Sequence, residues 1–342
     1  MDKIKNRVGF AAALCLLFCG AAAAADVSKV GITAAPFLEI GAGARPLGMG
    51  GAFVATADDA GALYWNPAGL TAVRNIELLF TNSSWLANIK YNFAGICFPV
   101  AGVGSLGAFI TTLNYGDMAV RTTDQPEGTG EIFSASDLAV GVSYARALTD
   151  RFTIGFNAKY IHQSIWHERA HGIAVDFGTL FVTGLHGLRI GASLLNFGTD
   201  MRMEGKDLLV FYDVDPYIIG NNDRVPANLQ TEHWPLPLTF QFGLAMDVLD
   251  DGFHRLTLAS DAVHPYDNTE SVNLGAEYAF RKMFFLRAGM RDLFLRDGEG
   301  GASFGAGFHL RLLGNMNLRI DYAYANFGRL DNAQHLSLTL NL

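Results

Sequence analysis

Two histidines four residues apart, His167 and His171, enclose a glutamate in the pattern of a metalloprotease zinc site. That chemistry needs a helix, because helical geometry places both imidazoles on one face and lets Glu168 activate a metal-bound water. Here one strand is expected to end near Trp166 and another to begin near Gly172. The intervening residues therefore indicate a charged surface loop rather than a catalytic metal centre.

Two other segments only partly resemble ligand sites. Residues 43–51 are rich in glycine, as a phosphate-binding loop is, but no Lys-Ser or Lys-Thr pair follows Gly48. A group of acids and amides could hold calcium, although its spacing fits no calcium motif; it contains Asp213, Asp215, Asn221, Asn222 and Asp223. No Ser–His or metal constellation has credible geometry. We therefore predict that the protein is not an enzyme and uses no cofactor or metal.

A basic strip is expected near the end of the chain, on one face of the last predicted strands. Its members are Arg281, Arg287, Arg291, Arg311 and Arg319. The strip could steer a carboxylate headgroup, or anchor another segment through Glu39, Asp58 or Asp59. It could equally pair with Glu277 and Asp321 in neighbouring strands. Most of these arginines lie near short predicted turns, which favours anchoring over ligand binding.

Composition and the N-terminus indicate an exported protein. The 342 residues include 25 basic and 33 acidic ones, 50% are hydrophobic and only 17% are charged, which excludes disorder and nucleic-acid binding. Residues 1–25 have the basic start, apolar run and small-residue end of a cleaved signal peptide. Its removal leaves 22 basic and 32 acidic residues and a single cysteine, Cys97, so that no intramolecular disulfide can form.

The elements that position the candidate residues are β-strands. From Ile76 to Leu342, apolar and polar residues alternate with period two in about fourteen segments, each with roughly 19 residues including its turn. That length is enough for a tilted strand to cross a bilayer. Short turns alternate with longer loops, which include residues 116–134 and 198–235. We predict an all-β fold: a transmembrane antiparallel β-barrel in the bacterial outer membrane, with its apolar side chains against lipid.

The segment before the barrel, residues 26–75, lacks period two and has seven glycines between Gly41 and Gly69. Glycine at this density permits close backbone approach, so the segment should fold compactly within the barrel lumen as a plug, or hatch. Asp58 or Asp59 could cap a short helix over residues 60–65 that Pro67 ends. The predicted organisation is a signal peptide (1–25), a hatch (26–75) and a barrel (76–342).

One predicted exterior loop carries an apolar patch. Phe211, Tyr212, Tyr217 and Ile218 lie within the long connection at residues 198–235. Because exposed apolar patches usually have a partner, this one could receive a hydrophobic ligand or a partner protein. Packing of the loop over the mouth of the barrel is the competing interpretation.

Residues 37–55, followed by Asp58, Asp59 and residues 64–70, closely resemble the PorV/PorQ family, which is similar to the FadL-type long-chain fatty-acid transporters. The Asn66-Pro67-Ala68 triplet matches the one in the hatch of those transporters. The resemblance assigns a hatch motif to Arg45, Gly48, Gly50, Asp58, Asp59, Trp65, Asn66, Pro67 and Ala68. It is specific over residues 37–75 and architectural afterwards, so that the ligand-pocket residues of the transporters cannot be carried over.

The resemblance implies a monomeric barrel with one of two roles. The first is passive transport of hydrophobic small molecules, such as long-chain fatty acids: capture on apolar loops, then release when the hatch around residues 66–68 shifts or the wall opens. The alternative is a component of type IX protein secretion that binds exported proteins at the outer membrane. Outer-membrane lipid is an expected partner in both cases.

Overall fold

The protein is described from a computed structural model that covers residues 30–342, apart from residues 186, 216, 218, 219, 221, 223, 296, 297 and 313–315. The predicted signal peptide, residues 1–25, lies outside the described residues. Within these residues no helix is both long and apolar enough to cross a membrane.

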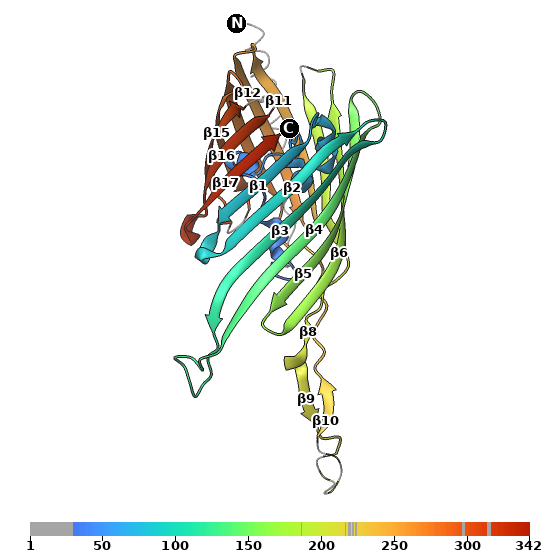
Figure 1. The fold of residues 1–342 in the computed structure, drawn as a ribbon, viewed down its shortest axis with the longest axis vertical. Helices are drawn as coiled ribbons and strands as arrows, with labels where there is room; N and C mark the ends of the chain where they lie inside the picture. Colours follow the sequence, from blue (N-terminus) through green and yellow to red (C-terminus); the bar gives the residue numbers. More distant parts are fainter. Residues whose placement is uncertain are drawn as a thin grey trace.

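Among the described residues, fourteen long antiparallel strands form one closed barrel, which confirms the predicted fold class and strand number (Figure 1). The last strand pairs with the first, β17 with β1, and closes the sheet. The strands are β1 (Glu77–Ser84), β2 (Lys90–Val100), β3 (Gly104–Ala119), β4 (Ile132–Ala147), β5 (Phe152–Ile165), β6 (Glu168–Val182), β7 (Arg189–Gly198), β11 (Thr239–Asp250), β12 (His254–Pro265), β13 (Ser271–Phe280), β14 (Phe284–Leu293), β15 (Ala302–Arg311), β16 (Asn317–Asn326) and β17 (Asn332–Asn341).

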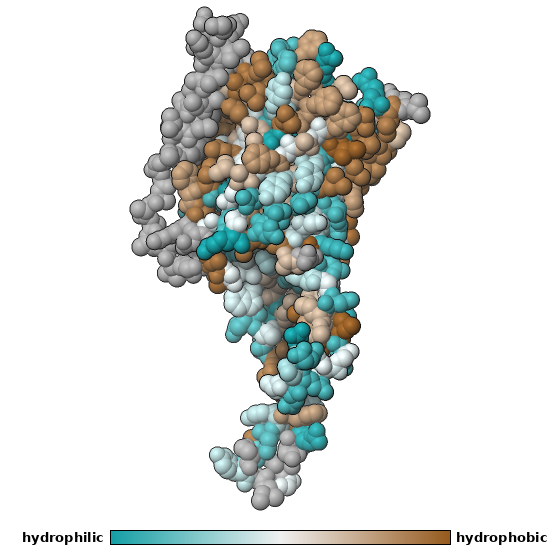
Figure 2. Space-filling model, turned by 90° about the vertical axis from the view of Figure 1, so that its left-hand side faces the viewer, coloured by the Kyte–Doolittle hydropathy of each residue, from teal (hydrophilic) through white to brown (hydrophobic). Residues whose placement is uncertain are grey.

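Side chains alternate between the lumen and the outer surface along each strand, as the period of two requires. On β17 the inward His335, Ser337 and Thr339 are buried, whereas the outward Leu336 and Leu338 are 47% and 40% exposed. In Figure 2 hydrophobic side chains gather mainly over the upper part of the molecule, and hydrophilic ones predominate below. An apolar outer belt around a polar interior is the surface that a membrane barrel needs.

The wall is longer on one side of the barrel. β3 and β4 have 16 residues each, whereas β14 and β17 have 10 each, a difference of about 20 Å. Along the outer face of β4, Val142 and Val140 give way to Ser136 and Ser134. We call this polar extension the wing; it comprises residues 112–119, 132–138, 160–165 and 168–173. The strands of the wing extend past their neighbours at the long-loop end (Figure 1). Its outer face is more polar than the belt, although Ile132 is exposed there, which is consistent with contact with water.

The two ends of the barrel differ in their connections. At the short-turn end, residues 101–103 join β2 to β3 and residues 281–283 join β13 to β14. At the long-loop end, the connection from β7 to β11 contains β8 (Glu204–Gly205), η5 (Lys206–Leu208), β9 (Leu209–Tyr212) and β10 (Val225–Asn228). Shorter 3-10 turns, η4 (Leu86–Asn88) and η6 (Gly328–Leu330), lie at the same end. β9 and β10 pair into a hairpin that extends away from the barrel (Figure 1).

The prediction of a loop over residues 167–171 was wrong. β6 begins at Glu168, so four residues of the histidine motif lie in a strand, and the chain turns through Trp166 and His167. The reason is the wing, where the strands continue past the apolar belt. Outward side chains there face water, so this part of the strand carries charged residues on its outer face. Its composition therefore looks like that of a loop.

Candidate functional site

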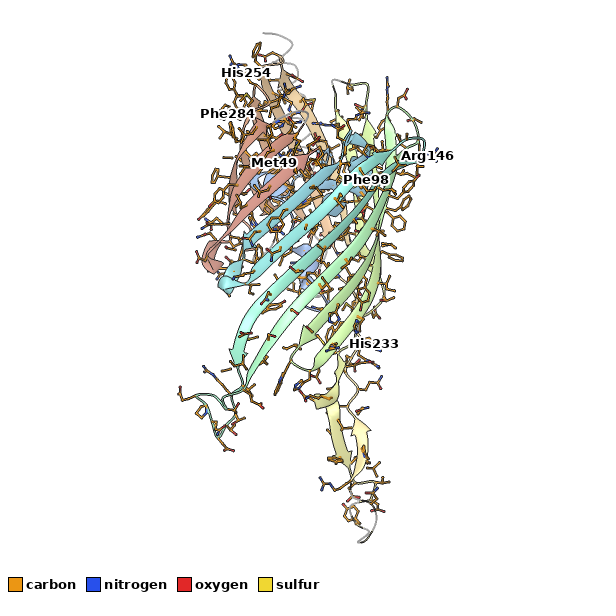
Figure 3. The ribbon with its side chains drawn as sticks, in the orientation of Figure 1. Met49, Phe98, Arg146, His233, His254 and Phe284 are labelled. Carbon is orange, nitrogen blue, oxygen red and sulfur yellow. The ribbon has the colours of Figure 1, made fainter. Side chains whose placement is uncertain are left out.

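The inner segment, residues 35–73, lies inside the barrel (Figure 1). It folds into η2 (Pro36–Glu39), α2 (Ala44–Gly48), α3 (Ala62–Trp65) and η3 (Pro67–Ala72). α2 contacts β14 to β17, whereas η3 contacts β3 to β6 on the opposite side of the lumen. Met49, which is fully buried, is labelled in Figure 3. α3 begins two residues later than the helix predicted over residues 60–65, and Pro67 opens a separate 3-10 helix.

Glycines on the inner face of the wall allow the inner segment to approach it backbone to backbone. A Cβ atom at Gly289 of β14 would lie 2.2 Å from Gly50 N, and one at Gly155 of β5 would lie 2.3 Å from Ala68 N. A Cβ atom would also lie 2.6 Å from Val54 O at Gly191, 2.5 Å from Met49 O at Gly275, and 2.2 Å from the Asn66 side-chain oxygen at Gly178. The segment therefore touches the wall on both sides and spans the lumen.

Six buried or partly buried side chains form a closed ring of alternating charge between the inner segment and the wall, which we call the ion-pair ring. Its contacts are Arg45–Glu277 at 2.9 Å, Glu277–Arg287 at 2.8 Å, Arg287–Asp321 at 2.7 Å, Asp321–Arg319 at 2.8 Å, Arg319–Asp59 at 2.6 Å and Asp59–Arg45 at 2.7 Å. Three arginines and three carboxylates balance one another, so the ring adds no net charge to the lumen.

The inner segment supplies Arg45 and Asp59 to this ring, and the wall supplies the other four members. Asp58 adds a further contact to Arg45 at 2.5 Å. Burial alone would raise the pKa of Asp59, but the Arg319 and Arg45 guanidiniums hold it well below its usual range. Asp59 therefore remains ionised at neutral pH, and removing one partner of such a buried pair is costly.

Three members of the predicted basic strip face the lumen. Arg287 and Arg319 belong to the ion-pair ring, and Arg291 donates to the carbonyl oxygens of Glu39 and Ile40 at 3.3 and 3.4 Å. These arginines therefore pair with wall carboxylates and contact the inner segment at once.

The strip prediction was wrong for Arg281 and Arg311. Arg281 lies exposed in the turn between β13 and β14 at φ 51°, with its guanidinium 5.4 Å from the ring of the outward Phe280. Arg311 ends β15 and is exposed at the short-turn end. Alternation assigns a side chain to one face only while the strand continues, so the rule fails where the chain turns.

The Trp65 and Asn66 side chains of the hatch motif bond to backbone. Asn66 Nδ2 donates to the carbonyl oxygens of Val54 and Thr179 at 2.8 and 3.0 Å, and Asn66 Oδ1 accepts from Ala68 N at 3.2 Å. Trp65 Nε1 donates to the carbonyl of Ala42 at 2.7 Å. Asn66 thus joins the inner segment to β6, while Pro67, which has no N–H, starts η3 beside it.

Asp261 of β12 is an anchor that the sequence interpretation missed. One of its carboxylate oxygens accepts from the backbone N–H groups of Phe53 and Val54, at 2.7 and 2.9 Å. The available signal was an acidic residue at an inward position of a strand. An inward acid could have faced water in the lumen, however, and only the placement of the inner segment gives it these two donors.

A cavity of about 430 Å³ opens between the inner segment and the long-loop ends of β11 to β14. Its lining mixes apolar residues such as Leu38 with charged groups, including Glu39, Asp267 and Arg291. Burial and the nearby Asp267 carboxylate raise the pKa of Glu39 to about 7, although Arg291 opposes the shift. The cavity thus carries a carboxyl group that titrates near neutrality.

Glu39 should make the folded state less stable as the pH rises. Its pKa is about 7 in the folded state against 4.5 for a free side chain, so this contribution is fully present below pH 4.5 and is lost as the pH rises through 7. The free energy of unfolding of the detergent-solubilised protein should fall over this range. It can be obtained from urea titration followed by the gel mobility of unboiled samples. Glu39→Gln should reduce the fall in the free energy of unfolding by about 3 kcal/mol; equal slopes for the two proteins would contradict the assignment.

The predicted exterior patch lies on the β9–β10 hairpin. Phe211, Tyr212 and Tyr217 are 59%, 58% and 93% exposed, and Ile218 lies outside the described residues. Arg224 places its guanidinium 4.8 Å from the Phe211 ring. The hairpin extends away from the barrel (Figure 1), so packing over the barrel mouth does not occur for these three side chains.

Two of the other candidate motifs have contacts within the chain. His167 Nδ1 lies 2.7 Å from Asp207 Oδ2, and Asp213 Oδ1 accepts a hydrogen bond from the backbone of Asp215. Asn221 and Asp223 of the calcium candidate lie outside the described residues. Within the described residues, no group of three or more His, Cys, Asp or Glu side chains is placed to hold a metal ion.

Sequence comparison finds a family match over the N-terminal part of the chain. Residues 23–186 match the family model of the type IX secretion system protein PorV. This region includes the inner segment and β1 to β6. No curated protein matches the chain.

Structural comparison finds that the fold of this chain is similar to that of FadL-type transporters. The toluene transporter TbuX of Ralstonia pickettii has 12% identity and a TM-score of 0.55, with 88% of this chain and 97% of that chain covered. The toluene transporter TodX of Pseudomonas putida has 12% identity and a TM-score of 0.53, with 88% and 96% covered. A FadL homologue of Pseudomonas aeruginosa has 11% identity and a TM-score of 0.50, with 86% and 96% covered. Identities this low establish the fold alone, and with the PorV match they confirm the predicted resemblance.

Proposed function

Because this chain is an outer-membrane barrel related to PorV and to the FadL-type transporters, we propose that it binds exported proteins at its long-loop end as a PorV-type component of type IX secretion. The observation that carries the proposal is the occupied lumen: the inner segment touches opposite walls without space for a side chain. A conduit needs a path through the barrel, whereas a docking protein needs a rigid body with accessible loops.

The β9–β10 hairpin is the proposed contact surface. It presents Phe211, Tyr212 and Tyr217 to solvent, and aromatic side chains are enriched in protein interfaces. It also lies beyond the apolar belt, where lipid does not compete for these rings. The favoured role thus differs from the transport role placed first on sequence grounds, because the sequence match is to a secretion protein.

The proposal predicts a secretion defect without a folding defect. In cells that lack the native protein, a variant with Phe211→Ser, Tyr212→Ser and Tyr217→Ser should leave exported proteins in the periplasm, while its own gel mobility remains that of a folded barrel. Phe253→Ser is the control, because Phe253 is 60% exposed at the short-turn end. Normal secretion by the hairpin variant would contradict the proposal.

Passive uptake of hydrophobic molecules is the second candidate. It is supported by the shared fold with toluene transporters and by the cavity beside Glu39. Uptake would require the inner segment to shift, which means that the ion-pair ring must open. A lipid or hydrophobic dye that co-purifies with the wild type, and is displaced by the change Leu38→Asp in the cavity wall, would favour uptake over protein binding.

A further inference from the structure

The outer face of the wing carries a histidine pair that the linear motif does not reveal. The β5–β6 register places His162 directly opposite His171. Their Nδ1 atoms are 3.2 Å apart, and their ring centroids are 4.7 Å apart. Tyr160 Oη lies 2.5 Å from His171 Nδ1. Three polar atoms from two paired strands therefore converge at one place.

This cluster lies where the wing leaves the apolar belt. On β6, Ile173 is 60% exposed on the belt side of His171, and Arg169 lies on the other side. Glu204 of β8 is opposite Arg169 in the register, and its carboxylate pairs with Arg202. His171 is exposed and His162 is half-buried, so both imidazoles can be reached from water.

We propose that His162 and His171 bind a divalent transition metal ion that prefers imidazole nitrogen, such as Zn²⁺. Two nitrogens that bind one Zn²⁺ at 2.0–2.1 Å with a tetrahedral angle lie about 3.3 Å apart. The observed Nδ1–Nδ1 separation of 3.2 Å is close to this value. A small rotation of each ring would direct both lone pairs to a shared ion, with Tyr160 and water able to fill the remaining positions.

The strand pairing gives the site its preorganisation. Two adjacent strands in register hold both histidines at a fixed separation, so the binding of an ion orders little additional backbone. By contrast His167, the other histidine of the linear motif, lies in the turn and contacts Asp207 instead. The partner of His171 is therefore nine residues earlier in the sequence, across the sheet, and not four residues earlier.

Titration of the full-length protein in detergent with Zn²⁺ alone, followed by calorimetry, tests the site. The wild type should bind one equivalent, and His162→Ala and His171→Ala should each abolish that binding. Co²⁺ in place of Zn²⁺ should give the visible absorption of a nitrogen-bound tetrahedral ion in the wild type only. His167→Ala is the matched control and should bind as the wild type does.

Three outcomes would overturn the proposal. The wild type binds no Zn²⁺, the double variant His162→Ala/His171→Ala binds it unchanged, or His167→Ala loses it to the same extent. Gel mobility of unboiled samples checks that every variant folds. The test does not depend on the proposed role in secretion, because it uses only the purified protein and the metal.

Discussion

Replacing Arg45 by Met is expected to destabilise the folded barrel by about 3 kcal/mol. The change leaves Asp59 and Glu277, which are 5% and 1% exposed, without their shared partner. The ion-pair ring then opens at the point where the inner segment joins the wall. Urea titration of the detergent-solubilised protein, followed by gel mobility, would give the free energy of unfolding.

The matched control is Arg281→Met, which removes an exposed arginine at the outer surface. Its effect should stay within about 1 kcal/mol. Arg45→Met combined with Asp59→Asn should cost less than the sum of the two single changes, because the second change removes a carboxylate that the first left with only one of its two ring arginines, Arg319. Equal losses in Arg45→Met and Arg281→Met would show that the ring contributes little.

Substituting Gly289 by Val is expected to have the larger effect and to prevent the inner segment from docking. Even the Cβ atom would lie 2.2 Å from Gly50 N, and the contact is with backbone, which cannot rotate away as a side chain can. Overpacking typically costs about 1–3 kcal/mol, and more is expected here because the obstructing atoms are backbone atoms. Gly289→Val should therefore yield little folded barrel, or a barrel with the segment displaced.

The neighbouring change Ala288→Val separates this effect from any general effect on β14. Ala288 is exposed on the outer face, so the added methyl groups meet lipid, and folding should match that of the wild type. Conductance in planar bilayers distinguishes the two outcomes for Gly289→Val, because a displaced segment opens the lumen. A Gly289→Val barrel with wild-type stability and no conductance would contradict the expected displacement of the inner segment.

The barrel could be predicted because the alternation of side chains along each strand is a local pattern in the sequence. A strand with one side in lipid and one side in the lumen must alternate, as β17 does with Leu336 and Leu338 against Ser337 and Thr339. Prediction was weaker in the wing, because water on the outer face removes the apolar half of the pattern. That is why the start of β6 was predicted to be a loop.

The candidate site could be predicted only as a set of residues. Arg45 and Asp59 were expected in a hatch motif, and Glu277 and Asp321 were expected as wall acids. Their connection through one ring depends on three strands of the sheet, β13, β14 and β16, meeting the inner segment, and spacing along the chain contains no such information. Asp261 was missed for the same reason, since its backbone donors lie about 200 residues away.

By itself, the sequence determined which side chains face lipid, how many strands close the barrel, and that a glycine-rich segment precedes them. These features follow from the solvent around each residue and from the conformations its own backbone allows. Only the tertiary structure decided which arginines bind the inner segment, which glycines make room for it, and that His171 meets His162. Those pairs are brought together by strand register and barrel closure, which act between residues far apart in the chain.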